Sequence, residues 1–266
     1  MIFFENIVIN CRDYKWVDIE YEYYIALVEL SERLTKEGIS RSDQVDKELD
    51  DLNECFKLIK EKLIEYLNSI KITSDLRNQE MQQILGINDK EILGKKLFVC
   101  FNYTHTVDKL YLENTIFKDD INYIHGELAD NSNPIIFGYG DEQASKYENI
   151  RELSNNGFLA NMKPICSVTD NYQKIMNFLD SENFTVKILG HSCGRSDRYL
   201  LNPIFEHVNC KSIRIYHYKT TSEEKNDYLN KRQEISRHLK NGNIMKIAPF
   251  DKYSTMPQNP KEKLIR

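Results

Sequence analysis

Three short clusters of polar residues carry the side chains that could do chemistry in this sequence. They occupy residues 102–106, 125–127 and 190–197, and each directly follows a run of largely apolar residues. Together they offer amide, imidazole, hydroxyl and carboxylate groups. An imidazole titrates close to neutral pH and often moves a proton in catalysis, whereas the other groups bind polar ligands. The clusters therefore predict a site for a polar small molecule.

Each cluster also has a purely structural explanation. Asn102 and Thr104 could cap a following helix, as could Asp197, and His125 could lie in a simple turn. Ligands, however, gather at the carboxyl ends of parallel strands, so we expect the three clusters to share one site. Asn102, His125 and Asp197 should then lie within about 10 to 12 Å of one another, the span of a small-ligand pocket.

The elements that must position these side chains follow Gly94. Apolar runs predict strands at residues 97–101, 122–124, 134–137, 184–189, 212–216 and 243–247. Helices are predicted at residues 169–179 and 222–240, the second preceded by a capping box at residues 220–224. Strands buried on both faces and alternating with helices indicate an α/β fold with a mostly parallel, Rossmann-like sheet.

The first part of the chain has a helical pattern instead. A helix is predicted from Trp16 to Lys36, with Gly38 placed to end it, and an apolar stripe from Val45 to Ile70 predicts a second. We expect the two to pack as an antiparallel hairpin, with a coiled-coil dimer as the alternative. The predicted organisation is a mainly helical region at 1–95, an α/β core domain at 96–250 and a loosely held tail at 251–266.

Composition excludes several classes of function. The 36 basic and 41 acidic residues give a net charge of −5. The basic residues are not concentrated in a patch, which argues against nucleic acid as a partner. The six cysteines are spaced singly, so we predict buried thiols and no metal site. No apolar run is long enough to span a membrane, and no export signal is evident, which predicts a cytoplasmic protein. The ten glycines form neither a P-loop nor a dinucleotide fingerprint. Gly138 and Gly140 begin the G-x-G-x-x-G pattern of the fingerprint, but Gln143 stands where its third glycine belongs.

The clusters and their flanks resemble a known family. The segments FNYTHT at 101–106, YIHG at 123–126, IIFGYGD at 135–141 and GHSCGRSD at 190–197 look like successive motifs of the AbiH family, bacterial proteins linked to abortive infection against phage. WVDIE at 16–20 is similar to the family's W-x-D-[IL]-E. The resemblance implies a role in antiphage defence.

The order of the motifs is also similar to sirtuin-like NAD-cleaving domains. That resemblance implies a sirtuin-like sheet and NAD or a related nucleotide as substrate. Asn102 would orient a water or a ribose hydroxyl, and His125 would act as general base. Ser192 and Asp197 would position the nucleotide. Further nucleotide contacts are expected from Thr104, Gly126, Gly190 and Ser196.

One departure from the family pattern concerns the start of the chain. AbiH proteins begin with a strand and a glycine-rich turn of the type G-N-G-F-D, which this sequence does not contain. We expect a sheet without that strand to be less stable, because its neighbours would lose hydrogen-bond partners. Otherwise residues 3–10, which include the run Ile7-Val8-Ile9, should take the vacant place.

Two other functions stay open at this point. Residues 190–194, GHSCG, match the G-x-S-x-G nucleophile elbow of α/β-hydrolases, and Asp227 and His238 follow in the order of an esterase triad, although both fall in the predicted helix 222–240. The third alternative is a non-catalytic nucleotide sensor or a partner-binding subunit of a defence system. A homo-oligomer is also left open.

Overall fold

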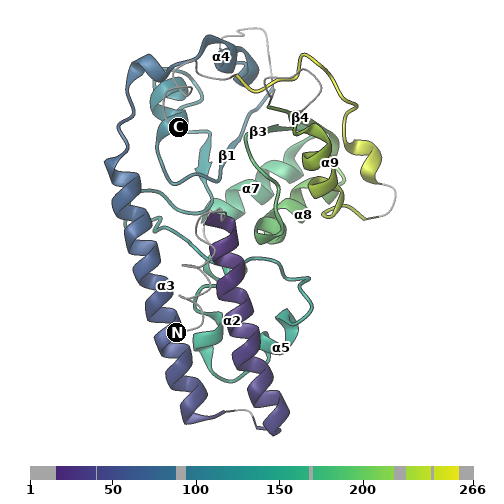
Figure 1. Cartoon of the computed structure of the whole chain (residues 1–266). Helices are drawn as coiled ribbons and strands as arrows, with labels where there is room; N and C mark the ends of the chain where they lie inside the picture. The colour runs from purple at the N-terminus through teal and green to yellow at the C-terminus, as the bar shows by residue number, and fades with distance from the viewer. Residues whose placement is uncertain are drawn as a thin grey trace. The chain divides into compact units, whose positions relative to one another are not determined.

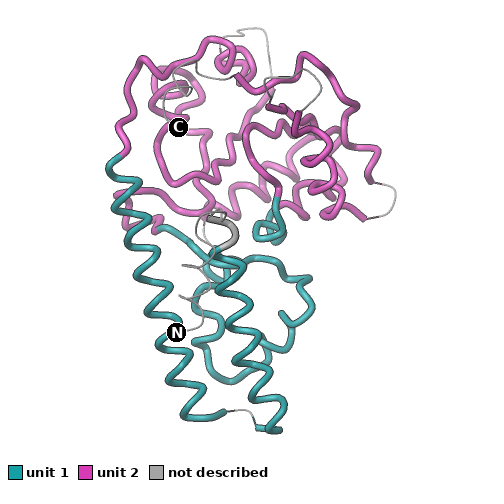
Figure 2. The backbone as a smooth tube through the Cα atoms, viewed as in Figure 1, with its two compact units in different colours: residues 1–69, 135–169, 194–200 teal, residues 70–134, 170–193, 201–266 magenta. Residues whose placement is uncertain are grey.

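The computed structural model describes residues 16–39, 41–87, 94–167, 170–218, 226–240 and 243–257. The chain divides into two compact units (Figure 2). Unit 1 comprises residues 1–69, 135–169 and 194–200, and unit 2 comprises 70–134, 170–193 and 201–266. Both units draw on residues before and after position 95, so the predicted boundary there stays a prediction.

Unit 1 is built on two long helices that run antiparallel, α2 (Trp16–Glu37) and α3 (Asp43–Ser69), as Figure 1 shows. Gly38 ends α2 with a φ of 64°, a left-handed conformation that glycine adopts without strain. The apolar stripe of α3 buries Phe56, whose ring stacks on Tyr23 of α2 at 4.1 Å and on Phe137 at 4.9 Å. This aromatic stack confirms the predicted hairpin.

Shorter elements complete unit 1. They are α5 (Tyr147–Arg151), η3 (Asn156–Leu159), α6 (Lys163–Cys166), η4 (Arg195–Asp197) and the first residues of α8 (Arg198–Glu206). α5 packs against α2 and η3 against α3. The segment between residues 135 and 169 is therefore held on the helical hairpin.

Unit 2 contains the described strands, in two parallel pairs. β1 (Phe98–Cys100) pairs with β2 (Ile121–Tyr123), and β3 (Phe184–Leu189) pairs with β4 (Cys210–Tyr216). Its helices are η1 (Ser74–Leu76), α4 (Gln79–Leu85), η2 (Asp108–Leu112), α7 (Asp170–Ser181), α9 (Tyr228–Ser236) and η5 (Asn243–Lys246). α7 packs against β2, whereas α9 and η5 pack against β4.

A hydrophobic cluster joins the strands of unit 2. Its buried members are Leu85, Leu110, Tyr111, Leu112 and Phe117. Phe98 of β1, Ile121 of β2 and Leu189 of β3 pack against it. No prediction from the sequence covered α4, whose ends are fixed by local contacts: the Asn78 side chain accepts from two backbone amides, and Gly86 closes the helix at φ 64°.

The structure confirms a mixed α/β fold with an N-terminal helical pair but corrects several elements. Within the described residues the strands form two pairs, not one large Rossmann-like sheet. Residues 134–137, predicted as a strand, have no strand partner in the described chain. Of the predicted strand 243–247, residues 243–246 form the short helix η5, and Ile247 bridges to Ile213. The predicted helix 222–240 is the shorter α9 in its described part.

The start of the tail is held more firmly than expected. His217 donates its amide to Ser254 and accepts from Met256, and Ser254 is buried. The predictions for residues 3–10, the capping box at 220–224, the helix start at Thr169 and the end of the tail from 258 lie outside the described residues. No helix in the described ranges has the length and apolar character needed to cross a membrane.

Candidate functional site

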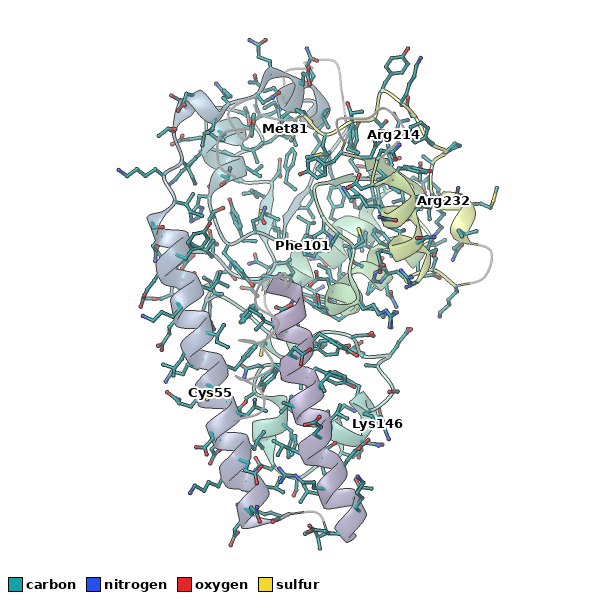
Figure 3. The ribbon with its side chains drawn as sticks, in the orientation of Figure 1. Cys55, Met81, Phe101, Lys146, Arg214 and Arg232 are labelled. Carbon is teal, nitrogen blue, oxygen red and sulfur yellow. The ribbon has the colours of Figure 1, made fainter. Side chains whose placement is uncertain are left out.

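The carboxyl ends of three strands meet around one aromatic ring in unit 2. Phe101 comes directly after β1 (Figure 3). Its ring contacts the ring of His125, which follows β2, with centroids 5.3 Å apart, and the ring of His191, which follows β3, at 4.0 Å. The two ring contacts bring together the segments that follow these strands, and we call seven of their residues the strand-end cluster: Asn102, Thr104, His125, Gly126, Gly190, His191 and Ser192.

The strand-end cluster has both exposed and buried members. Asn102 and Ser192 are exposed, and His125 is 4% exposed. Gly126 and Gly190 turn the chain with φ values of 82° and 73°, which residues other than glycine rarely adopt. Exposed amide and hydroxyl groups can bind a polar ligand, and an imidazole can exchange a proton with it.

A second polar network joins residues that follow β1 to residues of β2 and the segment after it, and its contacts were not predicted from the sequence. His105 Nδ1 is 3.1 Å from Asp108 Oδ2, and its Nε2 is 3.6 Å from Glu127 Oε2. The Tyr123 hydroxyl donates to Asp108 at 2.8 Å; burial, and then this hydrogen bond, raise the pKa of the phenol. The network ties the loop after β1 to the end of β2.

The thiol of Cys100 does not add a nucleophile to this region. Burial raises the pKa of Cys100 to about 11, so it stays a protonated thiol at neutral pH. Within the described residues, no group of three or more potential metal ligands comes together.

The geometry of the GHSCG segment does not favour the esterase. The positive φ of 57° falls on Cys193, which is buried, and not on the exposed Ser192 that would be the nucleophile. His238 Nε2 lies 2.8 Å from the Cys193 carbonyl oxygen, and Asp227 accepts from the Tyr218 amide and pairs with Lys231. These contacts give both predicted triad partners a structural role.

Unit 1 holds a different set of polar residues, which we call the buried charged cluster: Glu20, Asp141, Lys163, Asp197 and Arg198. Lys163 Nζ donates to Glu20 Oε2 and to Asp197 Oδ1, both at 3.0 Å. Arg198 donates to Asp141 at 2.5 Å. All five residues are at most 8% exposed. The sequence prediction missed Lys163, since nothing in its spacing marks it as a partner.

Glycines allow the chain to pass close to this cluster. A Cβ on Gly138 would lie 1.9 Å from the Asn161 carbonyl oxygen, and one on Gly140 2.2 Å from that of Ser196. The Gly138 amide instead donates to Glu20 at 3.1 Å. The FGYGD segment thus passes close to neighbouring backbone at both of its glycines.

The electrostatics of the buried charged cluster centre on Glu20. Burial raises its pKa from 4.5 to about 7, against the opposing attraction of Lys163, and the nearby Asp197 raises it further. The Asp197 carboxylate is engaged by Lys163, and the buried Ser196 hydroxyl has no hydrogen-bond partner among the described residues. Since Ser196 and Asp197 belong to unit 1, the expectation that they face Asn102 and His125 stays a prediction.

Comparison with known proteins decides the family. A family model described as bacteriophage abortive infection AbiH matches residues 2–219. The chain belongs to the AbiH family. No curated protein and no solved structure matches it. Every motif on which the resemblance rested lies inside the matched range, so the prediction is confirmed, and AbiH membership supports a role in abortive infection.

The AbiH motifs divide between the two units. The WVDIE segment, which contains Glu20, and the FGYGD segment, which contains Asp141, belong to unit 1, together with residues 194–197. The FNYTHT and YIHG segments and residues 190–193 belong to unit 2. In this AbiH protein, motif residues of unit 1 take part in the buried ion pairs, whereas those of unit 2 form the strand-end cluster.

Proposed function

We propose that this AbiH protein acts in abortive infection by binding and cleaving NAD, or a related nucleotide, at the strand-end cluster of unit 2. The observation that supports the proposal is the contact of Phe101 with both His125 and His191. It assembles the carboxyl ends of β1, β2 and β3, where α/β proteins bind their ligands.

The residues of the cluster suit the parts of such a substrate. Asn102 orients the attacking water or a ribose hydroxyl through its exposed amide. Ser192 holds a ribose hydroxyl, and Thr104 adds a further hydroxyl at the same edge. Gly126 and Gly190 let the ligand approach the backbone closely.

The proposed step is hydrolysis of the bond between the ribose and nicotinamide. The water oxygen forms a bond to the anomeric carbon while the nitrogen–carbon bond breaks, and its electron pair leaves with nicotinamide. His125 takes the proton of the water. Imidazole suits this role because its unperturbed pKa lies near neutral pH.

Incubation of the purified protein with NAD, followed by chromatography, tests the proposal. We expect release of nicotinamide, with Asn102→Ala reducing the rate and Asn177→Ala, an exposed asparagine on α7, leaving it unchanged. Saturable binding of NAD without nicotinamide release would identify a sensor and overturn the cleavage. Absence of both binding and release would overturn the site.

A further inference from the structure

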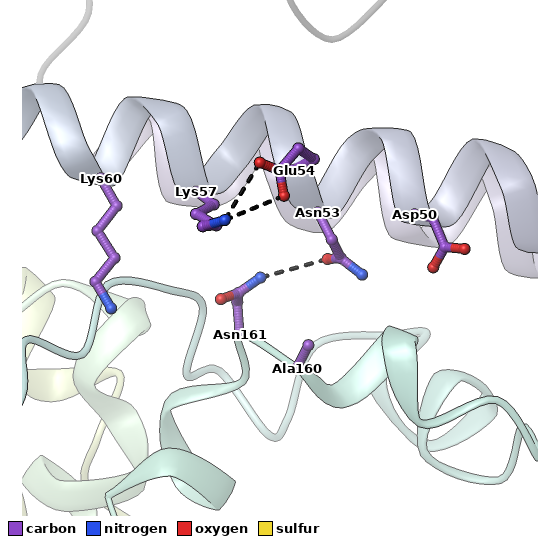
Figure 4. Close-up of a pocket in the computed structure, with 7 residues that line it drawn as sticks. All are labelled: Asp50, Asn53, Glu54, Lys57, Lys60, Ala160 and Asn161. Carbon is purple, nitrogen blue, oxygen red and sulfur yellow. Dashed lines mark hydrogen bonds and ion pairs between the residues drawn. The ribbon is translucent and has the colours of Figure 1, made fainter.

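Hydrogen-bond donors meet acceptors in the polar hollow of unit 1 between α3 and the turn at Asn161 (Figure 4). Asn161 Nδ2 donates to Asn53 Oδ1 at 3.3 Å. Lys57 Nζ donates to Glu54 Oε1, also at 3.3 Å. These pairs satisfy one another without a ligand. The ring of His105 in unit 2 is not matched in this way.

Both ring nitrogens of His105 face acceptors within the described part of the chain. Nδ1 lies 3.1 Å from Asp108 Oδ2. Nε2 lies 3.4 Å from the Leu128 carbonyl oxygen and 3.6 Å from Glu127 Oε2. A neutral imidazole has one N–H, so it would leave a lone pair facing an acceptor, whereas an imidazolium donates from both nitrogens. The contacts of His105 therefore fit the protonated ring.

His207, a second histidine of unit 2, shows the opposite arrangement. Its Nδ1 accepts from the Asn209 amide at 3.2 Å, and its Nε2 lies 3.2 Å from Asp180 Oδ1. A neutral ring with its hydrogen on Nε2 satisfies both contacts. His207 is therefore a matched control for the effect of protonation at His105.

The two carboxylates beside His105 are held by other side chains. The Tyr123 hydroxyl of β2 donates to Asp108 Oδ1 at 2.8 Å. Asn133 Nδ2 donates to Glu127 Oε1 at 3.0 Å. Both carboxylates thus keep a hydrogen bond when the ring loses its proton, and they remain in place as acceptors.

The charges that face His105 are all acidic. Besides Asp108 and Glu127, the exposed Asp130 interacts electrostatically with the ring, and the phenol of Tyr123 packs against it with centroids 5.2 Å apart. Among the described residues, His105 is the one cationic partner of Asp108 and Glu127. Loss of its proton would therefore leave the carboxylates without a counter-ion.

The same contacts join two segments of the strand-end cluster. The Leu128 amide, after β2, donates to the Tyr103 carbonyl oxygen, after β1, at 3.0 Å, and His105 adds its Nε2 contacts to this connection. Asn102 and Thr104 lie on the same short segment as His105. A weaker contact at His105 should therefore loosen the segment that carries them.

We propose that His105 is a positioning residue whose protonation regulates the strand-end cluster. The imidazolium holds the segment of Asn102 and Thr104 against the segment after β2, and loss of its proton loosens it. The His105 side chain is 28% exposed, so its proton can exchange with water. The functional part of this proposal rests on the proposed function, because the strand-end cluster is the proposed nucleotide site.

Hydrogen–deuterium exchange of the intact protein tests the contact without any ligand. Peptides covering residues 101–106 and 127–130 are followed at pH 6 and pH 8, and the rates are corrected for the intrinsic effect of pH. We expect the corrected exchange to be at least about threefold faster at pH 8, because the segments open more often. Equal corrected rates at the two pH values would overturn the proposal.

Two variants with opposite expected results assign the effect to the ring. His105→Gln cannot carry the charge, so exchange should be fast at both pH values. Glu127→Gln places an amide donor opposite Nε2, so a neutral ring is satisfied and exchange should be slow at both. His207→Gln should keep the wild-type change. Circular dichroism checks the fold, and Glu127→Gln decides the matter where His105→Gln does not fold. A wild-type change that persists in either variant would overturn the proposal.

Calorimetric titration with NAD at the same two pH values tests the link to the site. We expect the wild-type Kd to be at least about threefold higher at pH 8 than at pH 6, and the two values to be equal in Glu127→Gln. An equal wild-type Kd at both pH values would overturn the regulation. Absence of NAD binding at both would overturn the proposed function, whereas the exchange rates would still decide the role of His105.

Discussion

The buried charged cluster and the strand-end cluster both contain residues from AbiH motifs, yet they differ in what surrounds them. In unit 1, Lys163 satisfies two buried carboxylates and Arg198 a third. In unit 2, Asn102 and Ser192 are exposed, whereas His125 is buried. Charges that neutralise one another out of water hold a fold, whereas groups that face water can meet a ligand. Polar motif residues therefore divide by environment into structural and chemical groups.

The largest effect is expected at His125. His125→Gln removes the proposed general base and should lower nicotinamide release about 10² to 10⁴-fold, which corresponds to about 3 to 5 kcal/mol of barrier. Circular dichroism should show an unchanged fold. His207→Gln is the control, because His207 lies near Phe184 at the amino end of β3. Equal loss in both variants, or none in His125→Gln, would contradict the assignment.

Removing Lys163 should most strongly destabilise unit 1. Lys163→Met leaves Glu20 and Asp197 without their counter-ion, and breaking a buried pair costs about 3 to 5 kcal/mol. Urea unfolding measures the change. The control Lys146→Met breaks the exposed pair with Glu32 and should cost less than about 1 kcal/mol. Similar losses in the two variants would mean that the buried charges are not neutralised by Lys163.

The raised pKa of Glu20 predicts a dependence of stability on pH. Between pH 4.5 and about 7 the folded protein retains a proton that the unfolded chain has released, so this contribution falls as pH rises. The contribution is fully present below pH 4.5. A loss on the order of 3 kcal/mol across this window is expected from the size of the shift.

Glu20→Gln tests the source of that dependence, since glutamine cannot ionise. Unfolding in urea at several pH values should show a flatter curve for this variant than for the wild type. Glu48→Gln serves as a control, because the hydrogen bond from Arg33 lowers the pKa of Glu48. Removing this carboxyl should therefore not flatten the fall of stability with rising pH. A curve for Glu20→Gln as steep as that of the wild type would assign the effect to other groups.

The smallest effect is expected at Ser192. If this hydroxyl only positions a ribose, Ser192→Ala should slow nicotinamide release by less than about tenfold, or about 1.4 kcal/mol. An acyl nucleophile would instead account for most of the rate. A fluorophosphonate probe distinguishes a positioning hydroxyl from an acyl nucleophile, because the probe labels only an activated serine. We expect it to leave Ser192 unlabelled. Labelling of Ser192 would restore the esterase.

The sequence alone predicts the elements whose signals are local. The helical stripe from Val45 to Ile70 corresponds to α3, and the continuous apolar runs identify β1 through β4, because side-chain periodicity and strand propensity act within a few residues. The same reasoning fails at residues 134–137 and 243–247. At residues 243–247 the backbone amides of Asn243 and Ile247 bond to carbonyl groups three residues earlier, as in a tight helical turn, so an apolar run alone did not distinguish the two structures.

For the candidate sites, the sequence determined which residues carry the chemistry, and the tertiary structure decided what each one contacts. The motifs pointed to Asn102, His125 and Asp197, but their spacing held no sign that Lys163 would engage Asp197. Nor could it show that Phe101 would contact His125 and His191. Residue type is written locally, whereas burial and charge pairing depend on segments far apart in the chain, and these decide whether a carboxylate holds the fold or meets a ligand.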